Sequence, residues 1–241
     1  MANVMGEELI FEYTGKEILL ANETLLRNYN RWIVQQFAKY WKKNVTIKTT
    51  LDFGAGVGTL GILFKEMTNQ LPISLEIDGS QRDILLRRGF IVAKGIDEVS
   101  QEIGFVYSSN VLEHIEDDLA ALISIRKKMS RDGRLALYVP AFESIWTKMD
   151  DNVGHYRRYT KASLQEKLIK AGFEVESICY SDPIGFVLAK AFKLIGSESG
   201  NPGDRSLLLF DRVLFPVSAL LDRMTRHVFG KNVLAFAHVR R

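Results

Sequence analysis

The chain has 241 residues, of which 46% are hydrophobic and 25% charged, the proportions of a globular protein with a sizeable core. Its net charge of +3 gives no reason to expect nucleic-acid binding, and its one cysteine, Cys179, excludes an internal disulfide and a cysteine metal cluster. No apolar run reaches the about 20 residues that span a bilayer, and no signal-peptide pattern is present, so we expect one cytoplasmic domain over 1–241.

The first predicted element is a helix over residues 23–42. Its apolar side chains recur at helical spacing: Leu25, Leu26, Tyr29, Trp32, Ile33, Phe37 and Tyr40.

A strand over 49–53 is then followed by a glycine-rich turn and a helix over about 57–69. Gly54, Gly56 and Gly58 stand at alternate positions, two residues after Asp52. Glycine permits positive φ and close approach of the backbone to a ligand, and the N–H groups at the start of the next helix face that ligand. We therefore predict that a nucleotide-like molecule binds at the carboxyl edge of a parallel sheet.

The second predicted strand, 73–77, ends in an acidic segment. Asp78 is placed to accept hydrogen bonds from a ribose diol, as a carboxylate about 20 residues past the glycines does in nucleotide-binding sheets. Glu76, two residues earlier on the same strand face, is the alternative. A helix over 81–88 follows, for which Ser80 is the better candidate cap.

The remaining elements alternate between strand and helix, which indicates a doubly wound α/β fold. Strands are predicted at 90–93, 105–109, 134–139, 173–180 and 232–239, with a turn at Asp132 and Gly133 before the strand at 134. Helices are predicted at 117–129 and at 161–171, the latter capped by Thr160 and ended by Gly172.

These patterns resemble the class I S-adenosylmethionine (SAM)-dependent methyltransferases. The glycine spacing is similar to their first motif, and Asn110 to Asp118 resembles the segment after strand four in the small-molecule group related to ubiquinone-biosynthesis O-methyltransferases. The resemblance implies a seven-stranded, mostly parallel sheet of order 3-2-1-4-5-7-6, with an N-terminal helical lid within 1–45. It also implies SAM as cofactor, held by Asp52, the glycines 54, 56 and 58, Asp78, Asp97 and Asn110.

Two histidines are the candidate catalytic residues. His155 lies in the polar segment 150–159, and its pKa near neutrality suits a base that takes a proton from an acceptor hydroxyl. His114, just after strand four, is the second candidate base, with a loop-shaping role as its alternative. The four histidines lack paired spacing, so we expect no metal site.

The same segment holds the candidate substrate residues. Arg157 and Arg158 could grip a carboxylate or phosphate, and Tyr159 lies beside them. The alternative is structural: the arginines pair with Asp150 and Asp151, and the tyrosines pack.

An apolar insertion over 182–230 separates the last two strands. Two helices are expected, 183–195 and 207–221, the second kinked or restarted by Pro216, with a mobile loop at 196–204 between them. Three interpretations stay open: packing on the core or on a second copy, a roof over a hydrophobic substrate, or contact with a membrane surface.

We therefore expect methyl transfer to a small molecule, anionic or lipid-like, with an oxygen acceptor favoured over nitrogen or carbon. A SAM-binding protein without catalysis is the alternative, and the glycine spacing disfavours a nicotinamide enzyme.

Overall fold

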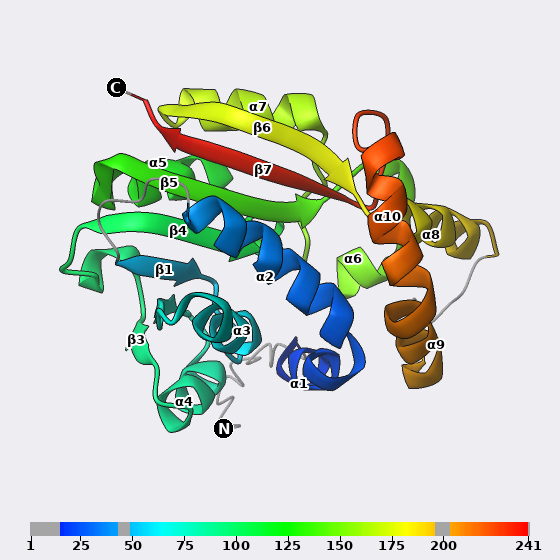
Figure 1. Cartoon of the computed structure of the whole chain (residues 1–241), viewed down its shortest axis with the longest axis horizontal. Helices are drawn as coiled ribbons and strands as arrows, with labels where there is room; N and C mark the ends of the chain where they lie inside the picture. The colour runs from blue at the N-terminus through cyan, green and yellow to red at the C-terminus, as the bar shows by residue number, and fades with distance from the viewer. Residues whose placement is uncertain (1–14, 43–48, 196–202, 241) are drawn as a thin grey trace, which may run out of the picture.

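The computed structural model describes residues 15–42, 49–195 and 203–240, and its centre is a seven-stranded sheet with helices on both faces (Figure 1). The strand order is β3-β2-β1-β4-β5-β7-β6. Neighbouring strands are parallel except that β7 runs antiparallel to both β5 and β6. The predicted fold class is therefore confirmed. The strands are β1 (Thr50–Phe53), β2 (Ile73–Leu75), β3 (Ile91–Ala93), β4 (Ile103–Ser109), β5 (Met129–Pro140), β6 (Phe173–Ser181) and β7 (Asn232–Val239).

Alternating side chains of the strands supply both halves of the core, because successive residues of a strand point to opposite faces. On one face, Phe105 and Tyr107 of β4 pack with α2 (Arg27–Trp41) and α3 (Thr59–Thr68). On the other face, Val106 packs with α5 (Asp118–Lys128) and α7 (Lys161–Lys170). α4 (Gly79–Arg87) packs near the β3 edge through Leu85.

The predicted helix over 23–42 is wrong in its start, because the chain forms two helices there. α1 (Gly15–Leu25) and α2 meet at Leu26, whose backbone leaves the helical region. α2 lies against the sheet, as its buried residues Ile33, Phe37 and Tyr40 require, whereas α1 is set apart near α3 (Figure 1). Of these two helices, α1 is therefore the one positioned to cover the glycine turn.

The predicted turn at Asp132 and Gly133 lies inside β5. Pairing with β4 shifts there, from Ile103 opposite Met129 to Phe105 opposite Arg134, so β5 carries extra residues as a bulge. The position is tight, since a Cβ on Gly133 would lie 2.8 Å from the Ser130 carbonyl oxygen. Tertiary pairing thus keeps in the strand a dipeptide that by itself favours a turn.

The insertion between β6 and β7 is helical, as predicted. α8 (Pro183–Ile195) matches the expected bounds, and the second predicted helix consists of α9 (Asp204–Leu209), a π-helical turn at Phe210–Leu214 and α10 (Phe215–Thr225), with Pro216 in the first turn of α10. The expected loop at 196–204 lies outside the described residues except for its last two. Within the described part of the chain, no helix combines the length and apolar character that crossing a bilayer requires.

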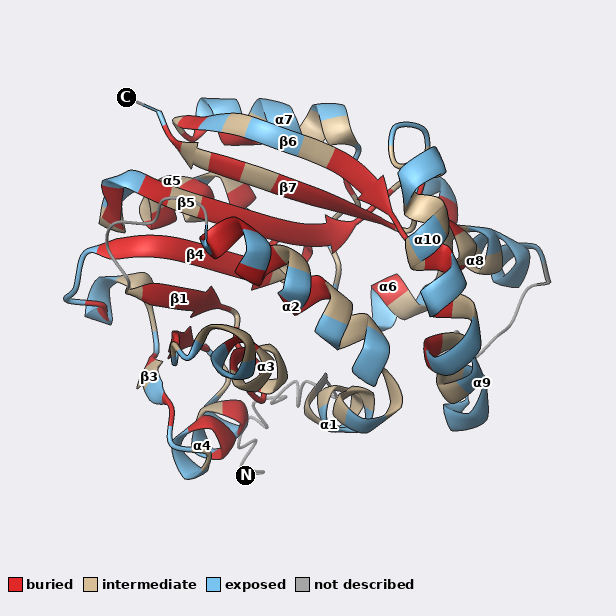
Figure 2. Cartoon of the chain, viewed as in Figure 1, coloured by how far each residue is buried: buried red, intermediate tan, exposed pale blue. Residues whose placement is uncertain are grey.

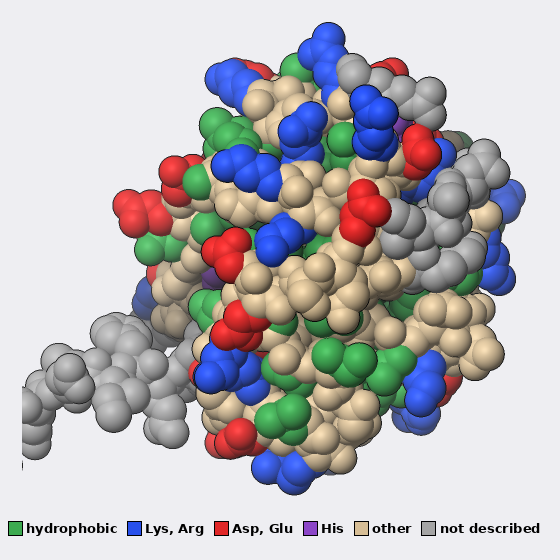
Figure 3. All heavy atoms as spheres, turned by 90° about the vertical axis from the view of Figure 1, so that its left-hand side faces the viewer, with side chains coloured by type: hydrophobic (Ala, Val, Ile, Leu, Met, Phe, Trp, Pro, Cys, Tyr) green, Lys and Arg blue, Asp and Glu red, His purple; other side chains and the backbone are tan. Residues whose placement is uncertain are grey.

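The outer faces of α8, α9 and α10 are largely exposed, whereas the central strands β1, β4 and β5 are mostly buried (Figure 2). Several exposed side chains of this region are large and hydrophobic: Val187, Phe192, Leu194, Leu209, Val213, Val217, Leu220, Met224 and Val228. By contrast, acidic and basic side chains are interspersed on the face at the left of Figure 1 (Figure 3).

Candidate active site at the carboxyl ends of the strands

Three glycines turn the chain sharply between β1 and α3. Gly54, Gly56 and Gly58 have φ values of 77°, 58° and 89°, all in the left-handed region that favours glycine. A Cβ on Gly54 would lie 2.4 Å from the side chain of Val111, which follows β4. The turn is thus bare backbone, held closely against the loop after β4.

The carboxylate of Glu76 spans from the end of β2 to this turn. It accepts a hydrogen bond from the N–H of Gly56 at 2.8 Å and another from the N–H of Asp78 at 2.9 Å. Glu76 is 7% exposed, and the next residue, Ile77, is 80% exposed. An acceptor group and an apolar side chain therefore stand side by side at the carboxyl edge of the sheet.

Asp78 caps α4, and the expectation that Ser80 is the cap is wrong. Oδ1 of Asp78 accepts hydrogen bonds from the N–H of Gln81 at 2.9 Å and from the Ser80 hydroxyl at 2.7 Å. Either side chain is a good cap by type, and the register of the turn decides between them. Both of these bonds are accepted by Oδ1 of Asp78.

Asp52 lies beneath the turn, 2% exposed. The hydroxyl of Tyr107 on β4 donates to its Oδ2 at 3.0 Å. Burial raises the pKa of Asp52 to about 7, opposed by the bond from Tyr107 and helped by the charge of Glu76.

The two other predicted cofactor residues follow β3 and β4. Asp97 is exposed in a 3₁₀ turn at Ile96–Glu98. Asn110 is exposed with φ 54°, and its amide donates to Ser109 Oγ at 3.3 Å. Both stand at the strand edge that carries the glycine turn.

Helix α1 is fastened over the glycine turn by a salt bridge that the sequence reasoning missed. Glu23 pairs with Arg88 at 2.8 Å and accepts from the Thr59 hydroxyl at 3.0 Å. Arg88 also donates to the carbonyl of Val57 at 2.9 Å. A Cβ on Gly56 would lie 3.0 Å from the side chain of Leu19. Charges 65 residues apart give no local pattern that would have predicted this contact.

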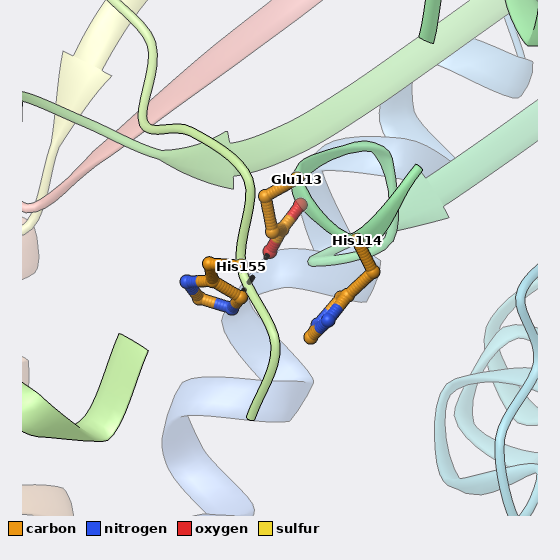
Figure 4. A group of neighbouring side chains, drawn as sticks. All are labelled: Glu113, His114 and His155. Atoms are coloured by element: carbon orange, nitrogen blue, oxygen red, sulfur yellow. Dashed lines mark ion pairs between the residues drawn. The ribbon is translucent and has the colours of Figure 1, made fainter. Parts of the chain in front are cut away.

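A second group of side chains lies just after β4. Glu113 and His114 end a 3₁₀ turn at Leu112–His114, and His155 comes from the loop after α6 (Lys148–Asn152); the three converge in Figure 4. One ligand atom from each lies within 4.8 Å of the others. The two histidine rings meet edge to face with centroids 4.5 Å apart. The structure therefore brings the two candidate bases together, with the carboxyl group of Glu113 facing His155.

Burial dominates the electrostatics of this group. It raises the pKa of Glu113 to about 8, and together with nearby His155 it lowers the pKa of His114 to about 4. The His114 ring also hydrogen-bonds the backbone of Val153 and Gly154, as its loop-shaping alternative anticipated.

Asp150 orients His155 and Arg158. Its Oδ1 lies 2.8 Å from His155 Nδ1 and accepts from Arg158 Nε at 2.8 Å, and its Oδ2 accepts from Arg158 Nη2 at 3.0 Å. Although burial opposes them, the bonds from His155 and Arg158 hold the pKa of Asp150 below its usual value. Arg158 thus makes the ion pair with Asp150 that the structural alternative anticipated, while Asp151 accepts from Trp146 instead.

The other two predicted substrate residues are held by Asp118. Arg157 pairs with this buried carboxylate at 2.9 Å, and the hydroxyl of Tyr159, 1% exposed, donates to it at 2.7 Å. Lys167 of α7 donates to the other oxygen at 2.6 Å. These polar groups fasten the loop to α5 and α7.

Comparisons with known proteins agree with this geometry. A family model described as a methyltransferase domain matches residues 23–178, more than half of the chain. No curated protein matches the sequence.

Solved structures share the fold at low identity. A SAM-dependent methyltransferase from Thermotoga maritima is 15% identical, with a TM-score of 0.55, and the match covers 92% of this chain and 99% of that one. The 1,6-didemethyltoxoflavin-N1-methyltransferase of Burkholderia thailandensis, solved with S-adenosylhomocysteine, is also 15% identical; its TM-score is 0.57, and the match covers 95% and 84%. Phosphoethanolamine N-methyltransferase 2 of Haemonchus contortus, in complex with SAM, has 15% identity and a TM-score of 0.60, over 93% of this chain and 57% of that one.

Proposed function

This chain belongs to the methyltransferase domain family, and we propose that it transfers the methyl group of SAM to a hydroxyl group of a small molecule. The observation that carries the proposal is the carboxylate of Glu76 fixed against the bare glycine turn. The two N–H groups that hold Glu76 leave further lone pairs on its oxygens for a ribose diol.

The residues at this edge fit the parts of SAM. The backbone at Gly54 and Gly56 admits a ligand closely, and the exposed side chain of Ile77 offers an apolar surface to an adenine ring. We assign the ribose to Glu76 in preference to Asp78, because Glu76 is fixed against the glycine turn by the N–H of Gly56, whereas Oδ1 of Asp78 caps α4. Asp52 and Asn110 stay candidates for the methionine end, and Asp97 for the adenine.

SAM supplies an electrophilic methyl group, so the protein has mainly to align the acceptor with it. A hydroxyl acceptor must also lose its proton, and the Glu113, His114 and His155 group is positioned for that task. Two roles fit: an imidazole takes the proton, or the group holds a cation that lowers the pKa of the hydroxyl. The buried carboxylate and paired histidines favour oxygen over nitrogen as the acceptor, although relatives named above methylate nitrogen.

The apolar helix α8, which reaches the loop before His155, favours an acceptor with an apolar part. α8 reaches the site loop, where Lys193 donates to the carbonyl of Ser144 at 3.0 Å and the Phe186 ring packs edge-on against Phe142. The outer surfaces of α8 and α10 then continue as exposed hydrophobic side chains. We expect the specificity constant to rise along a series of alcohols with one head group and lengthening alkyl chains; a flat series would contradict an apolar acceptor.

Titration calorimetry with SAM, followed by methyl release to candidate alcohols, tests the proposed function. Binding without transfer to any alcohol, together with transfer to amines, would reject the oxygen acceptor.

A further inference from the structure

We propose that Glu113, His114 and His155 bind a divalent transition-metal ion, a site that would activate the acceptor hydroxyl. The inference rests on the proposed function only for the use of the ion, since the ligand geometry stands by itself. It departs from the expectation, drawn from histidine spacing, that the chain has no metal site.

The first observation is a buried carboxylate without a hydrogen-bond partner. Glu113 is fully buried, and neither of its carboxylate oxygens has a hydrogen bond. Buried polar groups are nearly always satisfied, and one that is not destabilises the folded protein. A cation between the loops would satisfy it.

The second observation is the direction of the His155 ring. Asp150 is paired with Arg158, so its oxygens accept hydrogen bonds, and Nδ1 of His155 at 2.8 Å carries the hydrogen. The lone pair is therefore on Nε2, which faces Oε1 of Glu113 at 4.0 Å (Figure 4). At this distance the two atoms form no hydrogen bond, and both can donate electron pairs to an ion once Glu113 has lost its proton.

This arrangement is that of a metal ligand with its supporting carboxylate. Histidines that bind metals usually donate their other N–H to a carboxylate or carbonyl, which fixes the ring and the tautomer. Asp150 does so for His155, and the backbone of Val153 and Gly154 hydrogen-bonds the ring of His114. Both rings are therefore held before any ion binds.

The donor set indicates the kind of ion. Two imidazoles and one carboxylate suit zinc or iron(II) and leave coordination positions open for an oxygen of the acceptor. Ligand atoms lie about 2.0–2.2 Å from zinc, so neighbouring ligands on one ion are roughly 3 Å apart. The three ligand atoms here lie within 4.8 Å of one another, so small side-chain rotations would close them on an ion.

Methyl transfer from SAM to the acceptor oxygen changes no oxidation state of the metal ion and needs no oxidant or reductant. The positive charge lowers the pKa of the acceptor hydroxyl, whose proton passes to water. The acceptor oxygen then forms a bond to the methyl carbon as the bond from that carbon to sulfur breaks, and the sulfur keeps the electron pair.

Calorimetric titration of the chelator-treated full chain with Zn²⁺ tests the site. We expect one ion per chain, and at least about tenfold weaker binding in both Glu113→Gln and His155→Gln. His227→Ala, which alters an exposed histidine far along the chain, should bind Zn²⁺ as the unaltered protein does. Asp150→Asn should weaken binding by about 10- to 100-fold through the orientation of His155.

A crossed measurement separates this inference from the proposed function. Glu76→Ala should lose SAM affinity and keep Zn²⁺ binding, whereas His155→Gln should do the reverse. If Glu113→Gln does not fold, His155→Gln, at a partly exposed position, decides. The inference is overturned if the unaltered chain binds no Zn²⁺, or binds it no more tightly than His155→Gln does.

Discussion

The backbone N–H of Gly56 donates to the carboxylate of Glu76 at 2.8 Å, and this bond ties the turn after β1 to the end of β2. The two residues are 20 positions apart, and parallel pairing of β1 with β2 brings them together. The backbone N–H groups of the glycine turn and the carboxylate of Glu76 therefore lie at the same edge of the sheet. The proposed SAM site depends on this arrangement.

The carboxylate of Glu76 should determine SAM affinity. Glu76→Gln replaces one acceptor oxygen by a donor, and we expect binding weaker by about 1–3 kcal/mol, the effect of leaving buried hydrogen-bonding groups unpaired. Calorimetry with SAM measures it. Asp78→Ala is the matched control: it should lower stability by about 0.5–2 kcal/mol through the lost helix cap and change SAM affinity less. If Asp78→Ala lost more SAM affinity than Glu76→Gln, Asp78 would be the ribose-binding residue instead.

A side chain at Gly54 should disrupt the turn. Gly54→Ala combines a φ of 77° with a Cβ 2.4 Å from Val111. Left-handed backbone at a residue other than glycine alone disfavours the native state by about 1–2 kcal/mol, and the overlap adds to it. Urea unfolding should show this loss, whereas Gly95→Ala, with φ −157° and nothing within 4 Å of the added Cβ, should stay near the unaltered protein. Equal stabilities of the two variants would refute this account of the turn.

Much of the fold was predictable because its signals are local. The glycines at positions 54, 56 and 58 predicted the turn after β1. The apolar run at 232–239 predicted the bounds of β7. Which of Asp78 and Ser80 caps α4 could not be predicted, because both side chains are good caps by type. The conformation of the folded turn decides that Asp78 is the cap. The approach of His155 to Glu113 could not be predicted either. The two residues are 42 positions apart, and the path of the loop after β5, which brings them together, leaves no spacing pattern in the sequence.

Stability should fall as pH rises through the titration of Asp52. Its pKa is about 7 in the folded chain against an ordinary value of 3.8. The folded state therefore binds more protons than the unfolded state between about pH 4 and 7, and the free energy of unfolding decreases across that window. Urea unfolding at several pH values measures the slope.

Asp52→Asn mimics the protonated side chain and should remove this part of the slope, on the order of 4 kcal/mol for a shift of about three pKa units. Asp83→Asn, at an exposed aspartate, is the control and should leave the slope unchanged. Parallel curves for Asp52→Asn and the unaltered protein would show that Asp52 does not titrate in this window.

The Tyr159 hydroxyl should stabilise the loop through Asp118. Tyr159→Phe removes a 2.7 Å hydrogen bond to a buried carboxylate, and we expect about 1.5–3 kcal/mol of lost stability. Tyr156→Phe, at a side chain that is 55% exposed, is the matched control and should have little effect. If Tyr159→Phe were as stable as Tyr156→Phe and instead raised KM for the acceptor, Tyr159 would be a substrate residue.

The most direct measurement is a crystal structure of the protein with S-adenosylhomocysteine. We expect ribose hydroxyls within hydrogen-bond distance of Glu76, the amino-acid end against Gly54 and Gly56, and sulfur directed toward the Glu113, His114 and His155 group. A ligand bound elsewhere on the sheet, or a ribose held by Asp78 with Glu76 turned away, would contradict it.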